Sequence, residues 1–83
     1  SSDLQSAKDI LITSQLRTAL IVNKKIKATN YQIDTYKQRV YLYGIAMESK
    51  ERDLVLGEAR EISGVEKVIA SIMLVDDLRI QKN

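Results

Sequence analysis

The most regular pattern along the chain is the alternation of side chains in residues 39–46, Arg-Val-Tyr-Leu-Tyr-Gly-Ile-Ala. Successive side chains of a strand point to opposite sides, so this alternation predicts a strand with two different faces. One face carries small and aliphatic residues that suit a core: Val40, Leu42, Gly44 and Ala46. The other face carries Tyr41, Tyr43 and Ile45, and we expect it not to be left wholly to water.

Two further segments have the same two-residue period. Residues 31–36 place on one face Tyr31, Ile33 and Thr35. Residues 65–75 place on one face Val68, Ala70, Ile72 and Leu74. We expect 31–36 to pair antiparallel with 39–46 through a tight turn at Lys37-Gln38. Such a turn favours Asn-Gly or Asp-Gly because it needs positive φ, so a longer or bulged loop is the alternative.

Two segments have helical periodicity. Residues 6–22 are predicted to form the first helix, with one apolar stripe that consists of Ile12, Leu16, Ala19 and Leu20. The helix could begin at, or be capped by, Asp3, Ser6 or Asp9. Residues 1–5 are polar, and we expect them to fray. The second helix covers residues 49–62 with Ser49 as its N-cap, and its stripe consists of Val55, Leu56, Ala59 and Ile62.

Two glycines bear on the second helix. Gly57 lies inside it, where glycine costs about 1 kcal/mol relative to alanine, and we expect a close approach to the first helix or the sheet to explain it. Gly64 follows the helix, where it can adopt positive φ and end it.

The predicted order is helix, strand, strand, helix, strand within 83 residues, with no Pro and three Gly. We expect one domain over residues 1–83, with a core over about residues 9–75, flexible ends and a loose charged tail over 76–83. A right-handed crossover through the second helix places the last strand parallel to and beside 39–46. The predicted fold class is α+β, an αββαβ two-layer sandwich with a three-stranded mixed sheet and both helices on one face.

The first helix carries a second line of apolar and small residues, well away from its core stripe: Leu4, Ala7, Leu11, Ser14 and Thr18, with Ile10 and Ile21 towards the other flank. One interpretation is that a second helix or the N-terminal arm covers this line. The other is an exposed apolar edge for a partner or a membrane surface. The loop that follows holds Lys24, Lys25 and Lys27 around one anchoring Ile26, and it is either simply solvated or, with Arg17, a patch that faces anions.

The far face of the predicted sheet is also apolar. It would expose Tyr36, Tyr41, Tyr43, Ile69 and Met73. Tyrosine is an ordinary strand former, so this face is either unremarkable or a binding surface.

Composition narrows the chemistry. The chain has no Cys and no His, which excludes disulfides, Cys/His zinc sites and imidazole catalysis. The net charge is +2 and the pI is near 9.0, which leaves anionic partners open. No apolar run approaches the roughly 20 residues of a membrane-spanning helix. The carboxylates around the second helix alternate with Lys50, Arg52 and Arg60, as on a solvated helix surface: Glu48, Glu51, Asp53, Glu58 and Glu61. We expect no catalysis, no metal and no cofactor.

The pattern resembles the BON domain, a module named for bacterial osmotic-stress and nodulation proteins. The residues that match are Ile12-Thr13-Ser14-Gln15-Leu16 with Ala19-Leu20, Arg39-Val40-Tyr41-Leu42-Tyr43-Gly44, and Ile62-Ser63-Gly64-Val65-Glu66-Lys67-Val68. They span about residues 9–75, and the chain is most similar to the second BON module of the dual-BON outer-membrane lipoproteins. The resemblance implies an αββαβ fold and a non-enzymatic, periplasmic or outer-membrane-associated role. It also implies anionic phospholipid binding through the first helix, in which Leu11 stands where that module has an aromatic residue.

Two functional hypotheses follow. The first is a module that binds anionic phospholipid or a membrane surface through Leu4, Ile10, Leu11, Arg17, Lys24, Lys25 and Lys27. The second is a protein-interaction module in an envelope assembly, which would bind another BON module or an envelope protein through the tyrosine-bearing sheet face. Nucleic acid is disfavoured because Asp34 shares that face and the chain has neither a Gly-x-x-Gly clamp nor an RRM signature.

Overall fold

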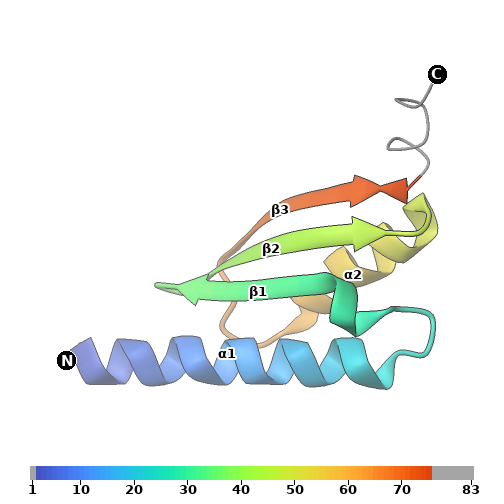
Figure 1. Cartoon of the computed structure of the whole chain (residues 1–83). Helices are drawn as coiled ribbons and strands as arrows, with labels where there is room; N and C mark the ends of the chain where they lie inside the picture. Colours follow the sequence, from blue (N-terminus) through green and yellow to red (C-terminus); the bar gives the residue numbers. More distant parts are fainter. Residues whose placement is uncertain (1, 76–83) are drawn as a thin grey trace.

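The elements follow one another in the order that the sequence pattern predicts. In this computed structural model, residues 2–75 are described, so the predicted loose tail over 76–83 lies outside the described residues. The elements are α1 (Ser2–Val22), a 3₁₀ turn η1 (Ala28–Asn30), β1 (Tyr31–Tyr36), β2 (Arg39–Ala46), α2 (Ser49–Glu61) and β3 (Lys67–Leu74). Figure 1 shows the three strands as one layer and the two helices as a second layer against it.

The sheet has β2 at its centre, in the order β1-β2-β3. β1 runs antiparallel to β2 with Ile33 opposite Leu42, and β3 runs parallel to β2 with Ala70 opposite Leu42. Parallel neighbours need a crossover connection, and α2 supplies it. The predicted α+β sandwich with a mixed three-stranded sheet and both helices on one face is therefore confirmed.

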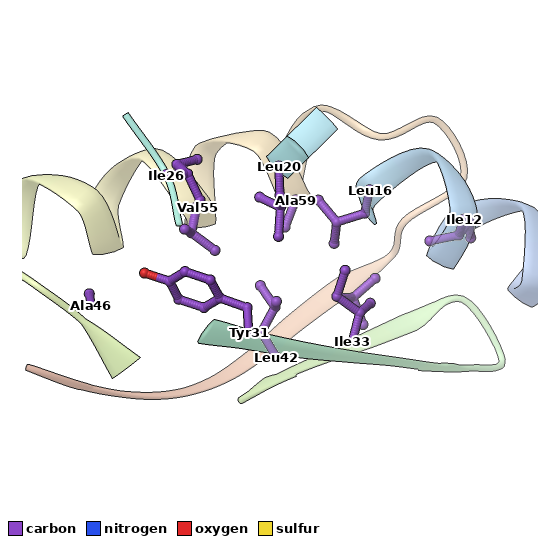
Figure 2. Close-up of a cluster of buried hydrophobic side chains, with 11 residues drawn as sticks. Ile12, Leu16, Leu20, Ile26, Tyr31, Ile33, Leu42, Ala46, Val55 and Ala59 are labelled. Atoms are coloured by element: carbon purple, nitrogen blue, oxygen red, sulfur yellow. The ribbon is translucent and has the colours of Figure 1, made fainter. Parts of the chain in front are cut away.

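The core lies between the helices and one face of the sheet. The alternation in β2 buries Val40, Leu42 and Ala46, and the α1 stripe buries Ile12, Leu16 and Leu20 against them. Figure 2 shows these helical side chains, with Val55 and Ala59 of α2, facing those of the sheet. Each fully buried aliphatic side chain contributes about 1.5 to 3 kcal/mol, so this cluster is the main source of stability.

Three local expectations about the helices need correction. The first helix begins at Ser2 and not near Ser6, so residues 2–5 are helical. The N-cap of α2 is Glu48, with extended backbone and no side-chain cap, and not Ser49. Gly57 makes no close approach, because a Cβ built there meets nothing within 4 Å.

Gly57→Ala is therefore expected to stabilise the domain. The added methyl group has open space, and alanine favours a helix interior over glycine by about 1 kcal/mol. Urea unfolding followed by circular dichroism should show a higher midpoint with an unchanged slope. A lower midpoint would mean that this position makes a contact that the structure does not show.

The β1–β2 connection is a two-residue turn, although neither of its residues is the type that such turns favour. Lys37 and Gln38 both have positive φ, at 51° and 64°. The Asp9 carboxylate accepts hydrogen bonds from both turn amides, at 2.8 Å from Lys37 and 2.9 Å from Gln38. Burial would raise the pKa of Asp9, but these hydrogen bonds and one from Gln5 lower it. A carboxylate from α1 thus holds the tight turn that the local sequence disfavours, and the longer loop does not form.

Candidate functional site

The side of α1 outside its core stripe is largely apolar and exposed. Leu4, Leu11 and Val22 lie on one line, about two and about three helical turns apart, and are 65, 56 and 71% exposed. Ile10 and Ile21 form a second exposed line. We call this surface the α1 outer strip, defined by Leu4, Ala7, Ile10, Leu11, Ser14, Thr18, Ile21 and Val22. Within the described part of the chain, no segment buries these side chains, so neither α2 nor residues 2–5 act as the predicted cover.

The α1 outer strip is uncharged except at one position. Between Leu4 and Val22 the charged residues of α1 are Lys8, Asp9 and Arg17. Arg17 follows Ser14 by three residues and precedes Ile21 by four, so helical spacing places it on the strip itself, whereas Lys8 lies beside the strip and Asp9 on the core side. A helix that is apolar on all sides is normally buried. The composition of the strip is therefore typical of a surface that is covered by a partner protein or a membrane.

The basic residues predicted for this site follow the strip at the C-terminal end of α1. Lys24, Lys25 and Lys27 are exposed, and Arg17 is exposed on α1 itself. Their loop has a defined shape because Ile26 is buried in the core. Asn23 adds two links, since its side chain accepts from the Lys25 amide and donates to Glu58.

The same loop faces the start of α2 across an open cavity of about 770 Å³. The loop contributes three lysines to the lining, and α2 contributes Lys50 and Leu54. Met47 and the carboxylates of Glu48, Glu51 and Asp53 complete the lining. We call this the lysine cavity. In Figure 1 the loop that follows α1 and the start of α2 lie at the same end of the molecule.

Glu51 forms the inner wall of the lysine cavity. The prediction that its side chain lies on a solvated surface is wrong. It is only 5% exposed, and its carboxylate accepts hydrogen bonds from the backbone amides of Lys27 at 3.0 Å and Met47 at 2.9 Å. Burial would raise the pKa of Glu51, but these two hydrogen bonds, together with the nearby Tyr31 hydroxyl and the charge of Lys27, hold the pKa below its ordinary 4.5. Glu51 therefore joins the α1–β1 loop to the β2–α2 connection.

Tyr31 lies behind Glu51 in the core. Its hydroxyl is buried and has no hydrogen-bond partner among the described residues. Burial, together with the nearby Glu51 carboxylate, raises the pKa of Tyr31 well above its ordinary 10.0. The hydroxyl therefore stays neutral at physiological pH and adds no charge to the cavity.

The five residues predicted for protein contacts share the face of the sheet opposite the helices. Tyr36, Tyr43 and Met73 are exposed there, whereas Tyr41 and Ile69 are partly buried. The register places Tyr41 beside Ile69. This outer sheet face and the α1 outer strip belong to different layers, so the two sets of predicted residues form two separate surfaces. Ile10 and Ser14 of the strip approach the edge of the sheet, where they line a groove with Asp34 of β1.

Sequence reasoning missed several residues of these surfaces. Val22 continues the line of Leu4 and Leu11, a signal that was present in the helical spacing. Ile45 is exposed on the outer sheet face beside Met73; strand alternation placed it on this face, but it was not among the residues predicted for protein contacts. Met47, Lys50 and Leu54 reach the lysine cavity only through the tertiary fold, so no local pattern indicates them.

Two kinds of site are not found within residues 2–75. The described residues hold no group of three or more acidic, His or Cys side chains that could hold a metal ion. Among these residues, neither helix combines the length and the apolar character that a membrane span requires.

Comparison with known proteins identifies the family. The BON domain family matches residues 8–76. The chain is also similar to an uncharacterized protein in the gshII 5′ region of Anaplasma centrale, with 37% identity over 68 residues. That alignment covers 82% of this chain but only 45% of the relative. The fold and this match together place the chain in the BON domain family, whose members are non-catalytic modules of periplasmic and envelope proteins that bind membranes or other proteins.

Proposed function

We propose that this domain binds the surface of anionic phospholipid membranes through the α1 outer strip and the basic residues next to it. The observation that carries the proposal is the exposed apolar strip from Leu4 to Val22, on which Arg17 is the one charged residue. An apolar helix surface rimmed by cationic side chains is typical of helices that lie in a membrane interface. Arg17 and the three loop lysines supply those cations.

The expected affinity is modest. Each Lys or Arg near an anionic surface contributes about 1 kcal/mol, and each fully buried Leu or Ile about 1.5 to 3 kcal/mol. Leu11 inserts less area than an aromatic residue would, and part of the gain offsets the loss of freedom on binding. Stable residence then depends on tethering or on a second module, since linkage adds avidity without new contacts.

The likeness to the second BON module of dual-BON outer-membrane lipoproteins fits this proposal. In such a setting the domain would act in the periplasm at the inner surface of the outer membrane. The Anaplasma relative extends well beyond the matched region, which leaves room there for further domains.

Leu11→Asp is expected to abolish most of the binding. The substitution places a negative charge in the middle of the α1 outer strip, where it must either enter the interface or hold the helix away from anionic headgroups. Leu11 is exposed, so folding stability should change little. In cosedimentation, vesicles of phosphatidylglycerol and phosphatidylcholine should retain the wild type, and vesicles of phosphatidylcholine alone should retain much less.

The matched control is Tyr43→Ser on the outer sheet face, which should leave vesicle retention unchanged. Equal retention by anionic and neutral vesicles would contradict the proposal, as would full retention of the Leu11→Asp variant.

A second candidate function is protein binding through the outer sheet face. The observation in its favour is that Tyr36, Tyr43 and Met73 are exposed together on a face that the described residues leave bare. A stable interface of this kind would be detected as self-association of the domain or as capture of a partner protein. Tyr43→Ser should weaken either interaction and leave vesicle binding intact. Sedimentation of the isolated domain as a monomer would remove self-association.

A further inference from the structure

The lysine cavity has the size and charge of a binding site for one anionic group. Its volume of about 770 Å³ falls within the range of about 300 to 1,000 Å³ that is usual for small-molecule sites. Four lysines line it, three from the α1–β1 loop and Lys50 from α2. Within residues 4–75, the one salt bridge is Arg52–Asp53, so none of the four ammonium groups forms one, although the charge of Lys27 acts on the Glu51 carboxylate and helps to lower its pKa.

The four lysines exceed the three carboxylates of the cavity lining by one charge. Both oxygens of Glu51 accept hydrogen bonds from backbone amides, and Asp53 lies 3.7 Å from the Arg52 guanidinium. Glu48 is the remaining carboxylate, and it is exposed at the start of α2. An anion in the cavity would therefore face a lining with an excess of one positive charge, in which the Glu51 oxygens are already engaged by backbone amides.

The cavity is held in shape by the core and not only by mobile side chains. The Glu51 carboxylate binds the amides of Lys27 and Met47, which fixes the loop and the β2–α2 connection against each other. Ile26 anchors the middle of the loop in the core. The backbone that carries the lysines is thus positioned before any ligand arrives, which lowers the cost of ordering the site.

We infer that the lysine cavity binds the phosphate of a single phospholipid headgroup, with one site per domain. Lysine binds phosphate as a point charge, and several lysines around one phosphodiester compensate its charge. Met47 and Leu54 give the cavity an apolar wall that inorganic phosphate could not use but that glycerol and the first acyl methylenes could contact. This inference rests on the proposed membrane function and adds to it a specific headgroup site beside the α1 outer strip.

The shared chemistry is a phosphate group, which could come from a lipid headgroup or from free phosphate. Amide chemical shifts of the ¹⁵N-labelled domain should therefore be titrated with three soluble probes: glycerophosphoglycerol, inorganic phosphate and glycerophosphocholine. We expect saturable shifts at Lys27, Lys50 and Glu51 with glycerophosphoglycerol, and weaker binding of the other two probes. Equal affinity for inorganic phosphate would overturn the headgroup assignment.

Lys50→Gln is the decisive variant because Lys50 lies outside the α1 outer strip and its basic rim. It should weaken glycerophosphoglycerol binding about fivefold, the fold-change that corresponds to one lysine contact. The matched control, Lys8→Gln, removes the same charge from an exposed position away from the cavity and should change binding less than twofold. Equal effects of the two variants would show that only net charge matters and would overturn the site.

Failure of this inference can be told apart from failure of the proposed function. Absence of shifts with every soluble probe, combined with vesicle binding that Leu11→Asp removes, would overturn the cavity and leave the α1 outer strip intact. Headgroup binding that Leu11→Asp leaves unchanged, without any vesicle binding, would support the cavity and contradict the strip.

Discussion

Replacing Gly44 with alanine is expected to destabilise the domain by about 3 kcal/mol or more, the upper part of the range for overpacked sites. Gly44 lies on the core face of β2 opposite Tyr31. A Cβ at this position would overlap the carbonyl oxygen of Asn30, and it would lie 2.6 Å from a ring carbon and 3.0 Å from the Cα of Tyr31. Two of these three atoms belong to the backbone, so relief requires β1 to move away from β2.

The loss would be a large fraction of the total stability, because small domains are stable by only about 5 to 15 kcal/mol. Urea unfolding of Gly44→Ala should show a much lower midpoint, or no folded baseline at 25 °C. Gly57→Ala is the matched control, since the same chemical change has open space there. An unchanged midpoint for Gly44→Ala would show that β1 and β2 are not as close as the structure places them.

Removal of the Glu51 carboxylate is the second change with a large expected effect. Glu51→Ala leaves the amides of Lys27 and Met47 without their acceptor, and each unsatisfied donor costs about 1 to 3 kcal/mol when water cannot replace the partner. The open lysine cavity gives water some access, so we expect a total loss of about 2 to 4 kcal/mol. Chemical denaturation at pH 7 measures this loss.

The same carboxylate makes stability depend on acid pH. The pKa of Glu51 is lower in the folded state than its ordinary 4.5, so its contribution is fully present above that pH. The contribution of Glu51 to stability is lost as the pH falls through its lowered pKa. The pKa of Asp9 is also lowered from its ordinary 3.8, so the contribution of Asp9 is lost in acid in the same way. Unfolding free energies measured between pH 2 and pH 7 should therefore fall less steeply for Glu51→Gln than for the wild type. Parallel pH profiles would contradict the buried, hydrogen-bonded carboxylate.

The sequence was sufficient to predict the elements whose periodicity is strong. The alternation in residues 39–46 separated a core face from an outer face, and the spacing of Ile12, Leu16 and Leu20 identified the buried side of α1. Both predictions succeeded because the residues of one face are related by a fixed local period. The uncovered second line of α1 was visible for the same reason, although its exposure could not be decided without the rest of the fold.

What the sequence did not predict depends on contacts between distant segments. Asp9 was considered only as a possible start of α1, whereas its carboxylate binds the amides of a turn that is 28 residues away. Glu51 resembles its acidic neighbours on α2, and only the approach of Lys27 and Met47 buries it. Lys50 joins the loop lysines in the same way. No local period marks such residues, because their partners are set by how the layers pack.

Binding of the α1 outer strip to an anionic membrane can be measured by amide chemical-shift mapping with anionic lipid micelles. We expect the largest shifts along α1 at Leu4, Leu11 and Val22 and in the adjoining loop at Lys24 and Lys25, with little change at Tyr43 or Met73. Shifts confined to the outer sheet face, or equal shifts with zwitterionic micelles, would contradict it.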